Sequence, residues 1–179
     1  MSFDRTGNLL GALSLTVADR TADGVAEAAG RSHTAAAALS WMHQFQQRPS
    51  VDLLRRVLGL TSSGTVRLID RLEEDGYLVR GPGPDGRTSS VSLIESGTRA
   101  AQKVALARAK VLEHALSTLT DDERRTLEEL HSKMLVSLMR NPDAVRWMCR
   151  ICDVGACRRD QGCPVTNVVR ERYGIATSL

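Results

Sequence analysis

The chain has 179 residues, enough for one domain or for one domain with an oligomerisation arm. Its composition, 42% hydrophobic and 25% charged, excludes a disordered chain, and with only 3% aromatic residues the core has to be built from Leu, Val, Ala and Met. The formal net charge of +3 is too small to identify a nucleic-acid-binding protein, so that argument has to rest on local clusters.

No stretch of about 18 consecutive apolar residues occurs, so we expect no transmembrane helix and no membrane partner. The first residues have only Arg5 before a short, interrupted apolar run, which argues against a secretory signal peptide. We therefore expect a cytoplasmic protein, in which cysteine thiols stay reduced.

Two helices are predicted at the start of the chain. The first covers residues 8–29, and its polar stretch at residues 19–23 is expected to bend or fray it. The second covers residues 32–46, with Ser32 as its N-cap. The apolar positions repeat at helical spacing, with Leu9, Leu13 and Val17 in the first helix and Ala38, Met42 and Phe45 in the second.

A helix-turn-helix pattern follows. Residues 50–58 predict a short helix that ends at Gly59, and a second helix, capped by Thr61 or Ser62, is expected to run to about Asp75. Two short helices joined by a turn that contains glycine are typical of this motif. The predicted buried stripe of the second helix is Val66, Ile69 and Leu72.

A β-hairpin is predicted directly after these helices. Residues 77–80 and 88–93 have the character of two short strands, and residues 81–86, GPGPDG, form the turn between them. The two prolines make that turn stiff. A recognition helix followed by such a hairpin is the arrangement of a winged helix.

Residues 96–119 and 120–140 predict two long helices, the second opened by a capping box from Thr120 to Glu123. Helices with apolar stripes need a partner, and two copies that pack these helices together are the simplest solution. We therefore predict dimerisation helices at residues 8–30 and 96–140 around a DNA-binding domain at residues 31–95. The expected buried face of the last helix is Leu127, Leu130, Met134 and Leu138.

Residues 50–97 resemble the winged helix-turn-helix of MarR-type transcriptional regulators. The matching residues are the run LTSSGTVRLIDRLEEDG from Leu60 to Gly76, then Leu78-Val79-Arg80, Asp85-Gly86-Arg87 and the run from Leu93 to Gly97. With the helical flanks, the resemblance extends over residues 8–140. It implies a mainly α fold with a small β-wing and a homodimer on a pseudo-palindromic operator in double-stranded DNA. It also implies a small-molecule effector pocket beside the dimerisation helices.

The candidate DNA-contacting residues lie at the start of the recognition helix and in the wing. Short hydroxyl side chains allow close approach to DNA, and free N–H groups at a helix start favour phosphate. Arg67 has the reach for a guanine edge or a phosphate, and Arg87, held by Asp85, suits a narrow minor groove. The predicted set is Ser50, Thr61, Ser62, Ser63, Thr65, Arg67, Arg80, Asp85 and Arg87, with Arg80 equally compatible with an internal ion pair.

All four cysteines lie close together in the pattern C-x2-C-x4-C-x5-C, within a Cys-rich extension at residues 141–165. Four thiolates satisfy tetrahedral Zn²⁺, so we predict one zinc ion per chain, which would supply the folding energy of an extension too poor in apolar residues for its own core. An iron–sulfur cluster, a thiol–disulfide switch and idle cysteines are the alternatives. The predicted ligands are Cys149, Cys152, Cys157 and Cys163.

Two further expectations concern the same end of the chain. Residues 166–179 are predicted to be a frayed tail. Trp147 is predicted to anchor the extension to the dimerisation helices. Near the other end, Trp41 and Met42 are interpreted as core residues rather than as the lining of an effector pocket.

These features predict a sequence-specific transcriptional regulator, more specifically a repressor because no separate activation domain is present, released by a small-molecule, metal or redox signal. The second hypothesis is a winged helix that binds protein or RNA and has a structural zinc site. An enzyme is not expected, since the sequence shows no Ser/His/Asp constellation and no phosphate loop. A thiol oxidoreductase using Cys149-x-x-Cys152 would need a βαβ context, whereas here the motif follows helices.

Overall fold

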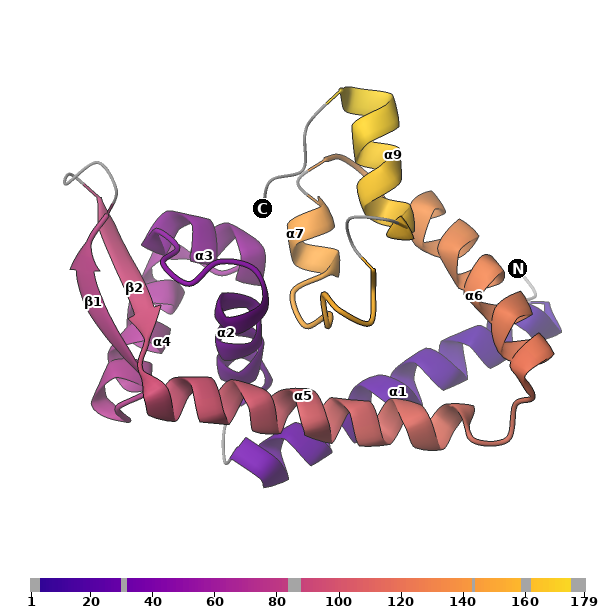
Figure 1. The fold of residues 1–179 in the computed structure, drawn as a ribbon, viewed down its shortest axis with the longest axis horizontal. Coiled ribbons are helices and arrows are strands. Elements are labelled where there is room, and N and C mark those ends of the chain that lie inside the picture. Colours follow the sequence, from indigo (N-terminus) through magenta and orange to yellow (C-terminus); the bar gives the residue numbers. More distant parts are fainter. Residues whose placement is uncertain (1–3, 30–31, 84–87, 143, 159–161, 175–179) are drawn as a thin grey trace.

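The structure is a computed structural model that describes residues 4–29, 32–83, 88–142, 144–158 and 162–174. It is mainly helical with one two-stranded antiparallel sheet, which confirms the predicted fold class. In Figure 1, α5 runs along the base, with the two strands at one end and α6 at the other. The elements are α1 (Arg5–Ala29), α2 (His33–Gln44), α3 (Val51–Leu58), α4 (Ser62–Glu74), β1 (Leu78–Pro82), β2 (Ser89–Leu93), α5 (Glu95–Leu116), α6 (Asp121–Ser137), α7 (Ala144–Met148) and α9 (Pro164–Tyr173).

The main hydrophobic core lies between α2 and the start of α5. Helix α2 is rich in alanine, so its neighbours approach its backbone closely, and residues 35–42 are all buried. Trp41 and Met42 are fully buried, and the Trp41 ring stacks on Phe45 with 6.0 Å between the ring centroids. The interpretation of Trp41 and Met42 as core residues is confirmed. The same core takes Leu54 and Val57 from α3, Ile69 and Leu72 from α4, Leu78 and Val91 from the strands, and Ala101 from α5.

Side-chain caps define where the helices begin. Ser32, Ser50 and Thr61 each accept a hydrogen bond from the backbone N–H three residues later. Gly59 ends α3 with a left-handed φ of 65°, which lets the chain turn at once into α4. The capping box predicted at Thr120 is present at the start of α6.

The long helices differ from the expectations in two ways. Helix α1 continues unbroken through residues 19–23, because Thr21 and Val25 are buried where it packs along α5. No residue of α6 is buried within the single chain, and two members of its predicted buried face, Leu130 and Leu138, are 48% and 70% exposed, so the chain alone does not cover that face. No helix in the described ranges is long and apolar enough to cross a bilayer.

The hairpin is longer than predicted. β1 extends to Pro82 instead of ending at residue 80, and Pro82 pairs with Ser89 of β2. Pairing continues that far because the Gly83 N–H still donates to the Thr88 carbonyl at 2.7 Å. The prolyl residue is tolerated there because the sheet has only two strands, both of them edges.

The C-terminal extension has a small core of its own. Helix α9 continues to Tyr173, held by Val165 and Val169 against the end of α6 and α7. The expectation of a frayed tail is therefore wrong for residues 166–173, and the expectation of an extension without a core is wrong as well. The buried members are Met139, Val145, Cys163, Val165 and Val169.

This extension bridges the two ends of the molecule. Helix α9 packs on α6, and α7 packs on α3 (Figure 1). Trp147 lies at the end of α3, where a Cβ on Gly59 would stand 3.8 Å from Trp147 Cδ1. The expectation that Trp147 anchors the extension to the dimerisation helices is wrong, because this side chain rests on the helix-turn-helix.

Candidate nucleic-acid interface and cysteine cluster

The start of α4 presents hydroxyl groups to the solvent. Thr61, Ser62 and Ser63 are exposed, and the Thr61 hydroxyl accepts from the Gly64 N–H at 3.1 Å. The other N–H groups of this first turn have no partner within the helix, as at any helix start. This surface has the composition that the sequence predicts for phosphate contact.

Thr65 is an interior residue, unlike the other predicted hydroxyls. It is 0% exposed, and its hydroxyl donates to the Thr61 carbonyl at 2.9 Å. Val66, predicted to be buried, is instead 48% exposed. The true buried stripe of α4 is Thr65, Leu68, Ile69 and Leu72, so the predicted DNA contact by Thr65 does not fit its position.

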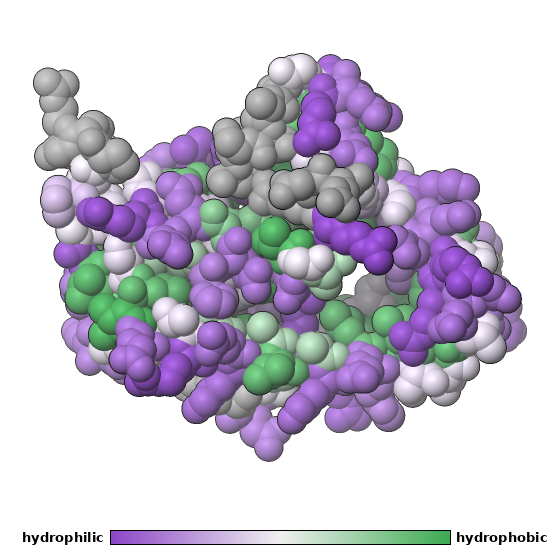
Figure 2. All heavy atoms as spheres, viewed as in Figure 1, coloured by the Kyte–Doolittle hydropathy of each residue, from purple (hydrophilic) through white to green (hydrophobic). Residues whose placement is uncertain are grey.

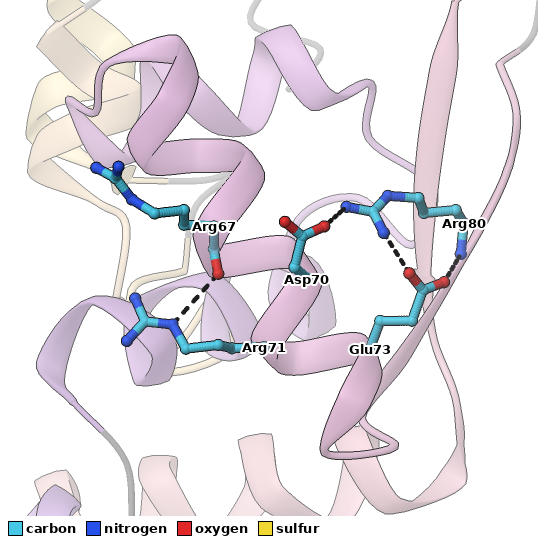
Figure 3. Close-up of polar contacts among 5 residues, drawn as sticks. All are labelled: Arg67, Asp70, Arg71, Glu73 and Arg80. Atoms are coloured by element: carbon cyan, nitrogen blue, oxygen red, sulfur yellow. Dashed lines mark hydrogen bonds and ion pairs between the residues drawn. The ribbon is translucent and has the colours of Figure 1, made fainter.

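Arg67 extends from the exposed face of α4, next to Val66. In Figure 3 its guanidinium points away from the acidic side chains of the same helix. The Arg71 Nε–H donates to the Arg67 carbonyl at 3.2 Å, which keeps Arg71 along the helix surface. Of these two arginines, Arg67 is therefore the one directed outward from the helix.

Arg80 of β1 is held by two acidic residues of α4 (Figure 3). Its guanidinium pairs with both Asp70 and Glu73, and its backbone N–H donates to Glu73 Oε1 at 3.1 Å. The hydrogen bond to Asp70 raises the pKa of the guanidinium above its ordinary value. Of the two interpretations of Arg80, the structure shows the ion pair, which joins the wing to α4.

The root of the wing is also joined to α3. The Val91 N–H donates to the Pro49 carbonyl at 3.1 Å, and Ser50 forms an isolated bridge with Ser90. Ser50 is therefore half-buried and serves both as the cap of α3 and as a partner of β2. Asp85 and Arg87, the predicted contacts of the wing tip, lie outside the described residues.

A groove of about 480 Å³ separates α3 and α4 from the wing. It brings together four of the predicted residues, Ser50, Ser62, Thr65 and Arg80, with Thr65 at its buried floor. The sequence interpretation missed Arg55, which enters the groove from α3 and pairs with Asp52 at 2.9 Å. Its place on the solvent side of an amphipathic helix, opposite the buried Leu54 and Val57, is the signal that could have identified it.

The four cysteines lie around one small cavity. It has a volume of about 10 Å³, and its other lining residues are Phe45, Val154 and Thr166. All four thiols are free of disulfides, and Cys163 is the most deeply buried. Cys149 shares hydrogen bonds with Cys152 and Cys163, and Cys163 with Cys157. The structure therefore brings together all four predicted ligands.

The thiols of this cluster differ in acidity. The hydrogen bond from Cys149 lowers the pKa of Cys163 well below that of a free thiol. Hydrogen bonds to Cys152 and Cys163 raise the pKa of Cys149. Within the described ranges, no three ligand-type side chains already surround a common point as metal ligands do.

Thr166 borders the cavity from the first turn of α9. It is 2% exposed, and its Oγ1 lies close enough to Cys163 to lower the pKa of that thiol. That oxygen nevertheless makes no hydrogen bond of ordinary geometry with any of the residues described.

The cluster is attached to the C-terminal end of α2. The Val154 N–H donates to Gln44 Oε1 at 3.2 Å, and Phe45, the residue that ends α2, lines the cavity. On the outer side, the Arg150 guanidinium lies 4.6 Å from the centre of the Trp147 ring. These contacts place the cysteines directly beside the core of the helix-turn-helix.

Comparison with known proteins finds a family match for the segment that contains α2, α3, α4 and β1. Residues 29–88 match the family model described as MarR family. RV1404 from Mycobacterium tuberculosis has a similar structure (TM-score 0.68, 19% identity, 78% of this chain and 97% of that chain). A transcription regulator of the Staphylococcus aureus multidrug efflux pump MepA is also similar (TM-score 0.66, 17% identity, covering 76% of this chain and 100% of that chain). So is the reduced form of MarR from E. coli (TM-score 0.62, 23% identity, covering 75% of this chain and 99% of that chain). No curated protein matches the chain in sequence.

Proposed function

Since residues 29–88 carry the MarR-family winged helix, we propose that the chain is a DNA-binding transcriptional regulator rather than an enzyme, and that it acts in the cytoplasm. The observation that carries this proposal is the exposed face of α4, where Ser62, Ser63 and Arg67 reach solvent beside the wing. A helix that presents short hydroxyls and one extended arginine suits the major groove, and a neighbouring hairpin suits the adjacent minor groove.

The proposed active species is a homodimer. Apolar side chains of α1 and α6 are left uncovered in one chain, among them Leu9, Leu13 and Leu130, which are 55%, 51% and 48% exposed. Figure 2 shows hydrophobic side chains at the surface over α5 and in the region where α1 and α6 overlap in this view. Uncovered apolar side chains on long helices are typical of subunit interfaces. A dimer would present two copies of α4 to a pseudo-palindromic operator.

In this proposal the dimer represses transcription by occluding a promoter, and a small-molecule, metal or redox signal releases it. The direct test is selection of binding sites from random-sequence duplexes with the full chain, followed by anisotropy titration of the selected duplex. We expect enrichment of an inverted repeat and saturable binding that weakens with salt. Salt-insensitive or unsaturable binding to duplex DNA would instead favour a protein- or RNA-binding winged helix.

The substitution Arg67→Ala tests the recognition helix. We expect it to weaken binding of the selected duplex by about 1–3 kcal/mol, roughly 5- to 150-fold, because it removes a base or phosphate contact. The matched control is Arg125→Ala, an exposed arginine on α6 whose partner is Asp122. Equal affinities of the two variants for the duplex would show that Arg67 does not contact DNA.

The substitution Arg87→Ala tests the wing tip, whose assignment rests on sequence position alone. We expect weaker operator binding and a slope of log affinity against log salt reduced by about one unit, as for the loss of one phosphate contact. The thermal midpoint of unfolding should stay that of the wild type, which separates lost contact from lost structure. An affinity unchanged across the salt titration would remove the wing tip from the interface.

A further inference from the structure

The four cysteines reach their common cavity from three separate parts of the backbone. Cys149 directly follows α7, Cys152 and Cys157 lie in the irregular segment after it, and Cys163 is the N-cap residue of α9. The chain has no other cysteine, so every thiol that it contains is gathered at this point. The arrangement gives four sulfur donors with short, chelating spacing.

The four cysteine side chains line one small cavity, which a single ion could share. A tetrahedral zinc site holds four sulfurs about 2.3 Å from the ion. The described thiols do not yet surround a common point, so binding has to draw them together around the ion. The cavity of about 10 Å³ has room for one small ion.

From this geometry we propose that Cys149, Cys152, Cys157 and Cys163 together bind one thiolate-preferring divalent cation of the zinc class. Loading leaves all four cysteines as thiolates and releases to the solvent the protons of those that were still thiols, so no oxidant or reductant takes part. Four thiolates and one divalent cation leave two negative charges at the site. The inference does not depend on the proposed function, since it concerns ion binding alone.

The surroundings of the cysteines fit a metal site. Phe45 and Val154 provide apolar walls that limit access of water. The buried Thr166 hydroxyl, which makes no ordinary hydrogen bond, is available to donate to a metal-bound sulfur. The charge of Arg150 interacts with Cys152 and offsets part of the negative charge. The site thus has a hydrogen-bond donor, Thr166, and a positive charge, Arg150, next to the cysteines that would bind the ion.

The loaded site would lie on the end of α2. The bond from Val154 to Gln44 and the place of Phe45 in the wall attach the metal-binding segment to that helix. A metal that fixes the four cysteines would therefore also fix the contact with α2, whose other residues form the core under α4.

The test titrates the reduced, full-length protein with Co²⁺ and then with Zn²⁺. We expect one equivalent of Co²⁺ to give the intense sulfur-to-metal absorption and the visible bands of tetrahedral thiolate coordination, and one equivalent of Zn²⁺ to replace it. Zinc should also protect all four thiols from reaction with a disulfide reagent. Four reactive thiols in the presence of zinc, or cluster absorption after anaerobic purification, would overturn the proposal.

Variants locate the site. Cys152→Ser is expected to weaken zinc binding by more than about 100-fold, since loss of an outer-layer partner alone typically costs about 10- to 100-fold. Glu171→Gln, a neighbouring exposed acid on α9, should bind zinc as the wild type does. Should Cys152→Ser lower the helix content, the stoichiometry and spectrum of the wild-type protein decide the question on their own.

Hydrogen–deuterium exchange tests the position of the site on α2. We expect zinc to slow exchange at the Val154 amide, which donates to Gln44, and at residues 44–45. One bound zinc with unchanged exchange at these positions would contradict the proposed contact between the metal site and the end of α2.

Discussion

Replacing Gly97 by alanine is expected to destabilise the protein by about 3 kcal/mol, the upper part of the range for an overpacked interior position. Gly97 lies in the first turn of α5, where an added Cβ would overlap with the Tyr77 carbonyl oxygen and lie 2.9 Å from the carbonyl carbon. That carbonyl accepts a hydrogen bond from the Ile94 N–H at 3.1 Å, so it cannot retreat without breaking this bond.

Urea unfolding followed by circular dichroism measures the effect. The matched control is Gly24→Ala in α1, where the nearest atom to an added Cβ is Val111 Cγ2 at 3.8 Å, an ordinary contact. Because alanine favours helix, this control is expected to be neutral or stabilising by up to about 1 kcal/mol. A Gly97→Ala variant that unfolds at the same urea concentration as the wild type would show that the first turn of α5 does not lie so close to the Tyr77 carbonyl.

Replacing Leu13 by aspartate is expected to convert the proposed dimer into a monomer at micromolar concentration. Leu13 is 51% exposed in one chain and follows Leu9 at one helical turn on α1. In a dimer it would be covered, and an unpaired carboxylate there costs several kcal/mol. A monomer holds only one half-site, so affinity for the selected duplex should fall by at least about 100-fold.

Light scattering after size-exclusion chromatography gives the mass of each species. Gln102→Asp adds the same charge to an exposed position of α5, two residues from the buried Val104 and so on the opposite face, and should remain dimeric. A dimeric Leu13→Asp variant would exclude this part of α1 from the interface, and a monomeric wild type would contradict the homodimer itself.

The helix starts could be predicted from the sequence because capping is a local effect. The hydroxyls of Ser32, Thr61 and Thr120 each reach a backbone N–H only three residues away, so the short-range pattern contains most of the information. The winged helix could be predicted equally well, since the sequence patterns of its turn, glycine and strands follow one another within a short stretch of the chain. The cysteine spacing likewise predicted four side chains that the structure brings to one cavity.

The parts that could not be predicted depend on contacts distant in sequence. Thr65 is buried instead of Val66 because its spacing to Leu68 and Leu72 follows the face that meets the core, and hydrophobicity alone ranks these residues the other way. The ion pairs of Arg80 require the return of β1 onto α4. The helix α9 exists because Val165 and Val169 find partners at the end of α6, which no local pattern reveals.

The attachment of the wing root to both neighbouring helices has a mechanical consequence. The bond from Val91 to Pro49 fixes β2 to the cap of α3, and Arg80 fixes β1 to α4. These contacts join α4 and the wing into one unit. If the proposed dimer binds an operator, a signal that releases it would then act by changing the distance or tilt between the two such units, so that their spacing no longer equals the pitch of the double helix.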